Sequence, residues 1–134
     1  MPITPITFAN SKPLNRVRNY RAYADAVVTN ASGSMKSSTI QCLVDTGSDY
    51  TILPLRAATA VGITPSGPPV TFRTAGGATY LLQSHLGVRL LVEGYIITVQ
   101  VAFSSAGGFS PILGRLEMAA AFDTGFDINN WYWG

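Results

Sequence analysis

Apolar and polar residues alternate along much of this chain, a pattern typical of β-strands that bury one face. In the segment Tyr95–Phe103, apolar side chains occupy every second position from Ile97 onward. This period of two places them on one face of a strand. The segment Gly87–Val92 is also largely apolar, and only the pair Glu93-Gly94 separates the two segments. We therefore predict a hairpin with a tight turn.

Two more hairpins are predicted from the same kind of pattern. Tyr20–Thr29 and Thr39–Val44 are strand-like, and turn-forming residues lie between them. Val70–Arg73 and Thr79–Leu82 flank a tip of small residues, which are Thr74, Ala75, Gly76, Gly77 and Ala78. We expect such a tip to be mobile and to let a ligand's backbone approach closely, although a simple surface turn is the plain alternative.

The helical segments are few and short. Pro54–Val61 has a proline suited to an early helical position and is followed by Gly62. Arg115–Phe122 is rich in good helix formers. The aromatic end of the chain, Phe126–Trp133, is strand-like and is expected to be covered rather than left in water. Together these patterns predict an all-β fold with one or two short helices.

The composition narrows the class of protein. With 134 residues the chain is one domain by size, too small for two well-developed lobes. Only 12% of the residues are charged and 47% are hydrophobic, so some apolar surface is expected to meet a partner. No apolar run approaches the ~18 residues of a membrane helix, and the start of the chain does not resemble a signal peptide. We therefore expect a cytoplasmic protein without a membrane contact.

Charge and ligand-forming residues argue against several other classes. A net charge of +2 is too small to indicate a nucleic-acid partner. Four basic residues lie in one N-terminal stretch, and we interpret them as a solvated face: Lys12, Arg16, Arg18 and Arg21. Cys42 is predicted to be a small buried hydrophobe, and His85 a surface residue. No cluster of ligand-forming residues points to a metal or another cofactor.

Candidate chemistry appears at one place, where Asp45-Thr46-Gly47-Ser48 follows the apolar strand ending at Val44. A carboxylate at the end of a buried strand has to be solvated by hydrogen bonds or share its charge with another group. Gly47 allows the backbone to turn tightly enough to supply such bonds.

The order of these parts resembles the retropepsin-like aspartic proteases, and bacterial and retrotransposon-type members in particular. The resemblance runs from about Tyr20 to the C-terminus. Its residues are Leu43-Val44-Asp45-Thr46-Gly47-Ser48, Ile52-Leu53-Pro54, the glycine-rich hairpin tip and Ile112-Leu113-Gly114-Arg115. Asp-Thr-Gly alone is a weak match, but its combination with the second motif and the tip is specific. The resemblance implies an acid-protease closed barrel at residues 20–134, preceded by an N-terminal extension at 1–19.

In this family two Asp-Thr-Gly loops face each other, and their carboxylates hold a water that attacks the peptide carbonyl. Two carboxyl groups about 3 Å apart cannot both ionise cheaply, so the pair acts as base and acid together, as described for other aspartic proteases. A second Asp-Thr-Gly occurs at Asp123, but it follows a predicted helix and only nine residues follow Gly125. We interpret it as a turn. The resemblance therefore implies a homodimer in which Asp45 pairs with its symmetry mate.

Roles for other positions follow from the same resemblance. Thr46 would hydrogen-bond to the opposite loop, Gly47 would accept bonds from the substrate backbone, and the Ser48 hydroxyl would donate to the catalytic carboxylate. Asp49 and Arg115 would form an ion pair that ties the C-terminal helix to the loop. Thr74, Ala75, Gly76, Gly77 and Ala78 would form the flap that closes on bound peptide.

The sequence thus indicates a homodimeric aspartic endopeptidase that acts on an extended peptide or protein. One alternative is a non-catalytic dimerisation or peptide-binding module of the same fold. A second alternative gives the basic N-terminal stretch a nucleic-acid contact.

Overall fold

The structure is a computed structural model. It describes the backbone of residues 12–14, 16–18, 21–45, 47–73, 76–105, 110–115, 124–126 and 131–133, and the side chains of 23–45, 47–73, 76–105 and 110–115. The predicted second helix, apart from Arg115, lies outside these residues, as do Asp123 and the first two residues of the hairpin tip.

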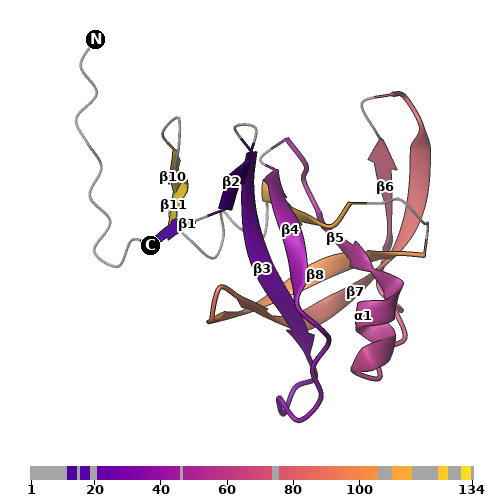
Figure 1. The fold of residues 1–134 in the computed structure, drawn as a ribbon. Coiled ribbons are helices and arrows are strands. Elements are labelled where there is room, and N and C mark those ends of the chain that lie inside the picture. The colour runs from indigo at the N-terminus through magenta and orange to yellow at the C-terminus, as the bar shows by residue number, and fades with distance from the viewer. Residues whose placement is uncertain are drawn as a thin grey trace, which may run out of the picture.

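Most of the described chain is β-strand, which confirms the predicted all-β class. The strands are β1 (Lys12–Leu14), β2 (Arg16–Arg18), β3 (Arg21–Thr29), β4 (Ile40–Asp45), β5 (Thr51–Pro54), β6 (Pro69–Arg73), β7 (Thr79–Val92), β8 (Tyr95–Ser104), β9 (Ile112–Gly114), β10 (Thr124–Phe126) and β11 (Trp131–Trp133). The main sheet has the order β2-β3-β4-β9-β5-β8-β7-β6, and a further pairing of β3 with β7 closes its central strands into a ring (Figure 1).

The three predicted hairpins are present. β3 and β4 pair with Ala26 opposite Ile40, and β6 and β7 pair along the whole length of β6. β7 and β8 meet at the tight turn of Glu93 and Gly94, whose φ angles are 49° and 88°. Two successive positive φ values are the mark of the two-residue turn that matches the right-handed twist of paired strands.

β7 links two parts of the fold because it is much longer than its partners. Its first residues, Thr79–Gln83, pair with β6 and its last four pair with β3, while β8 runs beside it from Gln83 onward. The register shifts between His85 and Val88, where Gly87 has a φ of 69°. This bulge redirects the strand, so that one element serves both the barrel and the hairpin that extends from it.

The helix predicted at Pro54–Val61 is confirmed as α1 (Leu55–Ala60). Pro54 precedes its first turn, and Gly62 follows its end with a φ of 75°. Ala57 and Ala58 are buried on the side that faces the barrel. Small residues there let the helix pack closely against the sheet.

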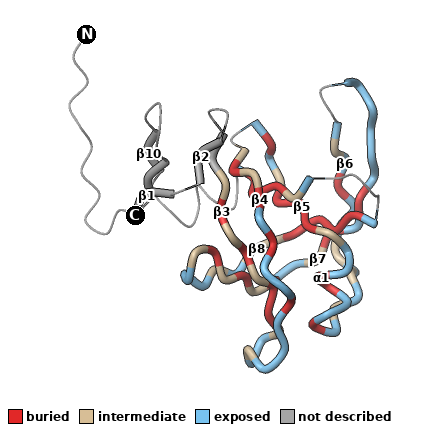
Figure 2. The backbone as a smooth tube through the Cα atoms, viewed as in Figure 1, coloured by how far each residue is buried: buried red, intermediate tan, exposed pale blue. Residues whose placement is uncertain are grey.

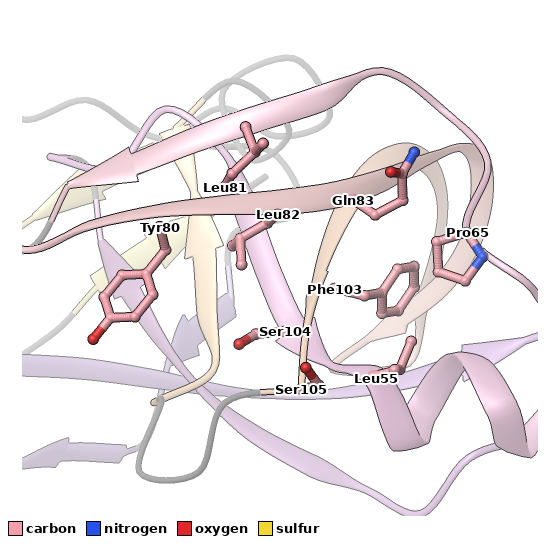
Figure 3. A pocket seen from close by; sticks show the side chains of 9 residues that line it. All are labelled: Leu55, Pro65, Tyr80, Leu81, Leu82, Gln83, Phe103, Ser104 and Ser105. Atoms are coloured by element: carbon pink, nitrogen blue, oxygen red, sulfur yellow. The ribbon is translucent and has the colours of Figure 1, made fainter.

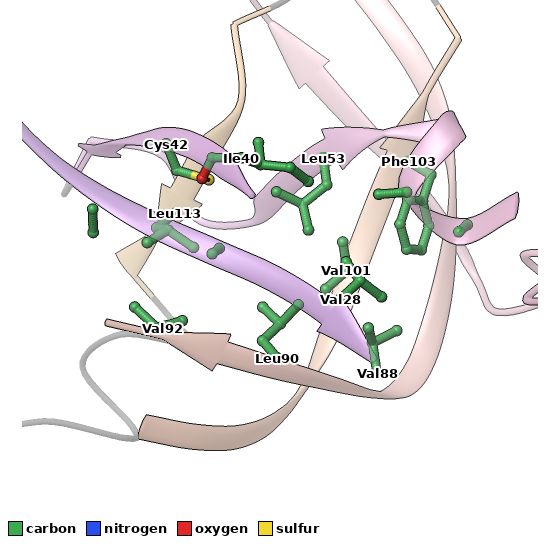
Figure 4. Packing of buried hydrophobic residues seen from close by; sticks show 14 of the residues in the cluster. Val28, Ile40, Cys42, Leu53, Val88, Leu90, Val92, Val101, Phe103 and Leu113 are labelled. Atoms are coloured by element: carbon green, nitrogen blue, oxygen red, sulfur yellow. Dashed lines mark hydrogen bonds between the residues drawn. The ribbon is translucent and has the colours of Figure 1, made fainter. Parts of the chain in front are cut away.

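The core fills the interior of the ring (Figure 4). Side chains from β3, β4, β5, β7, β8, β9 and α1 meet in one cluster, whose largest members include Leu53, Leu90 and Leu113. Burial is concentrated on these inner strands, whereas the loop at residues 30–36 and the end of the β6–β7 hairpin are largely exposed (Figure 2). A smaller cluster around Ile52 and Val70 lies at the base of that hairpin.

Strands near both ends of the chain form a second, three-stranded sheet. β11 pairs with β10 and with β1, both antiparallel. The stretch Phe126–Trp133 was predicted to be strand-like, and its described residues lie in two strands, the end of β10 and β11. β1 and β2 both precede residue 20, but β2 pairs with β3 in the main sheet. Within the described residues, no helix has the length and apolar character required to cross a membrane.

Cys42 is fully buried, as predicted, and lies in the main cluster. Burial, together with the negative charge of Asp25, raises the pKa of its thiol from 9.0 to about 12. The folded state therefore keeps a proton that the unfolded chain releases. The stabilisation from this difference is fully present below pH 9 and is lost as the pH rises towards about 12.

We expect iodoacetamide near pH 8 to modify Cys42 very slowly in the native protein and rapidly in urea, because the reactive species is an accessible thiolate. Mass spectrometry of timed samples measures both rates. Equal rates in the two states would contradict the buried position of the thiol.

Candidate active site

Asp45 is the last residue of β4, and the apolar core ends immediately before it. Val44 is buried, whereas Asp45 is half-buried, so the carboxylate lies at the boundary between core and solvent. β4 lies between β3 and β9 in the sheet, and Asp45 is opposite Gly114 in the parallel register of β4 and β9. A strand paired on both sides positions this side chain more firmly than a free loop would.

The backbone turns sharply after Asp45 and solvates its carboxylate. The N–H of Gly47 donates to Asp45 Oδ1 at 2.9 Å, and the N–H of Ser48 donates to the Asp45 carbonyl at 3.2 Å. A side-chain carboxylate that accepts from the backbone two residues later is a common turn-forming arrangement. A Cβ at position 47 would stand 3.2 Å from Asp45 Oδ1, so glycine leaves this contact unstrained. Thr46 lies outside the described residues.

Ser48 takes a different hydrogen bond from the predicted one. Its side chain is buried, and its hydroxyl donates to the backbone carbonyl of Tyr50 at 2.9 Å. A hydroxyl has one proton to donate, so in this arrangement Ser48 does not donate to Asp45. Its contribution is to hold the turn that follows the carboxylate.

β9 supports this turn from behind. The N–H of Arg115 donates to the Ser48 carbonyl at 2.7 Å, and the N–H of Gly114 donates to the buried Thr51 hydroxyl at 3.0 Å. The approach is so close that a Cβ on Gly114 would lie 2.3 Å from the carbonyl carbon of Tyr50. Only glycine fits here without a shift of the backbone. Sequence reasoning noted Gly114 only as part of a motif, and it missed Thr51.

The structure brings Asp49 and Arg115 together. Arg115 Nη2 lies 2.6 Å from Asp49 Oδ1, and the two side chains are 58% exposed for Asp49 and 55% exposed for Arg115. Ion pairs this exposed contribute about 0 to 1 kcal/mol to stability. The backbone bond between Arg115 and Ser48 therefore joins β9 to the loop at least as firmly as the ion pair does.

The β6–β7 hairpin carries the predicted flap. Gly76, Gly77 and Ala78 at its tip are exposed, and Thr74 and Ala75 lie outside the described residues. Gly77 has a φ of 87°, and no atom lies within 4 Å of where its Cβ would be. Among the described residues, the space beside Gly77 is therefore open.

A cavity of about 440 Å³ lies where this hairpin leaves the sheet (Figure 3). It is lined by Tyr80–Gln83 of β7, by the end of β8 at Phe103–Ser105, and by Leu55 and Pro65. None of these side chains carries a formal charge, and Asp45 is not among them. This cavity therefore lies at the base of the hairpin, and the Asp45 carboxylate is not part of its lining.

His85 was predicted to lie at the surface, but it is half-buried. Its Nδ1 accepts a hydrogen bond from the N–H of Ser66 at 3.3 Å. Within the described part of the chain, no three His, Cys, Asp or Glu side chains gather as a metal site would require.

Comparison with known protein families gives a match. The sequence model of a family described as aspartyl protease matches residues 31–115, which is more than half of the chain. The matched span includes Asp45-Thr46-Gly47-Ser48, the β6–β7 hairpin and Ile112-Leu113-Gly114-Arg115. No curated protein matches the chain.

Gly114→Ala is expected to lower the free energy of unfolding by about 3 kcal/mol or more, because the added methyl group overlaps the backbone of Tyr50 and Thr51. Urea unfolding measures the change. Ser110→Ala, an exposed position just before β9, is the control and should stay within about 0.5 kcal/mol of the wild type. Equal stability of the two variants would contradict the close approach of Gly114 to the backbone of Tyr50 and Thr51.

Proposed function

Because the chain belongs to the aspartyl protease family, we propose that it is an aspartic endopeptidase whose active unit is a homodimer. One Asp45 from each chain forms the catalytic pair, and the substrate is an extended peptide or protein segment. The observation that carries the proposal is the position of Asp45 at the end of a doubly paired strand, with its carboxylate held by the Gly47 N–H.

A pair of carboxyl groups can perform the reaction without a covalent intermediate. The ionised carboxylate takes a proton from water, and the water oxygen attacks the peptide carbonyl carbon. The protonated partner gives its proton to the carbonyl oxygen, which leaves a tetrahedral diol. Transfer of a proton to the peptide nitrogen then allows the carbon–nitrogen bond to break. One carboxyl group cannot be base and acid in the same step, so the mechanism requires two.

The second carboxyl group is assigned to a second copy of the chain. Thr124 and Gly125 of the other Asp-Thr-Gly triplet are residues of β10 and do not form the predicted turn. β10 pairs with β11 in the terminal sheet and not with the strands around Asp45. Asp49, the next acid after Asp45, contacts Arg115. A two-fold axis near Asp45 would instead bring two identical loops together, and two-fold dimers are the commonest protein oligomers.

The β6–β7 hairpin supports an extended substrate. β6 is the last strand in the order of the main sheet, and the exposed tip carries two glycines beside Ala78. Backbone groups at such a tip can pair with an extended peptide, as strands do when they add to a sheet. The uncharged lining of the cavity at the base of this hairpin favours substrates with apolar side chains around the cleaved bond.

Asp45→Asn is expected to abolish peptide cleavage, because an amide can neither take the proton from water nor return it. Asp123→Asn is the matched control, since it makes the same change in the other Asp-Thr-Gly triplet, and it should keep nearly wild-type turnover. A peptide library incubated at about pH 4 to 6, with and without a pepstatin-type inhibitor, measures cleavage.

The two variants separate the alternatives. Activity that survives in Asp45→Asn would contradict the proposed function, and so would equal loss in both variants. Wild-type protein that binds peptides without cutting them would favour the non-catalytic module.

A further inference from the structure

Thr51 is a polar residue with no exposed surface, at the first position of β5. Its Oγ1 accepts a hydrogen bond from the Gly114 N–H, and the bond is buried and 3.0 Å long. Buried hydroxyls at the start of an apolar strand have a desolvation cost, so each is expected to serve a specific partner. Here that partner is the residue directly opposite Asp45.

The backbone alone does not make this connection. β5 and β9 are paired at a single position, where Ile52 is opposite Ile112. Beyond that position no further pair joins the two strands, and the Gly114 N–H turns to the Thr51 side chain instead. The Thr51 hydroxyl thus adds one more hydrogen bond between β5 and β9. This bond lies at the end of β9 that supports the active-site turn.

β5 is itself firmly held. It pairs in parallel with β8, and Thr51 is opposite Val101, which is fully buried. A chain of contacts therefore connects the barrel to Asp45. β8 pairs with β5 at Thr51, the Thr51 hydroxyl binds the Gly114 N–H, and Gly114 is opposite Asp45 in the pairing of β9 with β4. Each step is a backbone pairing except the one made by the Thr51 hydroxyl.

We propose that Thr51 is a positioning residue for Asp45. Its hydroxyl fixes the Gly114 end of β9 and so sets where the Asp45 carboxylate lies when two chains meet. This inference rests on the proposed function. Two carboxyl groups that share a water need tight relative placement, and misplacement of reacting groups by about 1 Å can reduce rates by about 100-fold.

The test replaces the hydroxyl while keeping the shape. Thr51→Val keeps the branched side chain but leaves the Gly114 N–H without its acceptor. Thr51→Ser keeps the hydroxyl and loses only a methyl group. Thr29→Val is the matched control, since Thr29 is also a buried threonine in a strand. It is the last residue of β3, at the end of the β3–β4 pair opposite to Asp45.

We expect Thr51→Val to lower kcat by about 100-fold with KM within about twofold of the wild type, because substrate-binding groups on the flap are unchanged. Thr51→Ser should recover most of kcat, and Thr29→Val should leave it unchanged. All rates are measured at a temperature at which circular dichroism shows each variant to be folded. Equal kcat in Thr51→Val and Thr29→Val would overturn the inference, as would equal losses in Thr51→Val and Thr51→Ser.

A second readout does not depend on catalysis. Amide hydrogen exchange, followed by NMR, should show a protected Gly114 N–H in the wild type and in Thr51→Ser, and faster exchange in Thr51→Val. If the wild type has no Asp45-dependent cleavage, the proposed function fails. Unchanged exchange at Gly114 in Thr51→Val would then overturn the positioning inference on its own.

Discussion

The contact between Gly114 and the backbone of Tyr50 and Thr51 is the constraint on which the site depends. β9 is a three-residue strand between β4 and β5, parallel to one and antiparallel to the other. β9 can pair with β4 as far as Asp45 only if its last residue, Gly114, passes close to the backbone of Tyr50 and Thr51. A side chain at position 114 would overlap that backbone. The absence of a single Cβ therefore allows the carboxylate to be supported from behind by a strand.

Hydrogen bonds then hold the turn in layers. Nearest to the carboxylate, the Gly47 N–H binds Asp45 itself. Further out, the Ser48 hydroxyl binds the next part of the turn, and the Arg115 N–H binds the Ser48 carbonyl. The exposed pair of Asp49 and Arg115 is the outermost layer, where water weakens charge attraction. The firmest support comes from behind these layers, where the Gly114 N–H donates to the Thr51 hydroxyl in a buried bond that water does not weaken.

The sequence predicted what local patterns encode. Alternating apolar residues and turn residues identified the hairpins, and Pro54 and Gly62 marked the short helix. Asp45 was identified because a charged residue directly after an apolar strand is unusual. The acceptor of the Ser48 hydroxyl could not be predicted, because it depends on the exact path of the turn. The bond from Gly114 to Thr51 could not be predicted, because it joins two segments that are distant in sequence. The pairing of β11 with β1 could not be predicted either, because it joins segments more than 110 residues apart in sequence.

The central claim is that Asp45 is half of an active site that two chains complete. Wild-type protein co-refolded with increasing amounts of Asp45→Asn protein tests it most directly. If two carboxyl groups are required, random pairing predicts that activity per wild-type chain falls in proportion to the wild-type fraction, to about half in an equal mixture. Activity per wild-type chain that stays constant at every ratio would contradict the claim, because each chain would then carry a complete site.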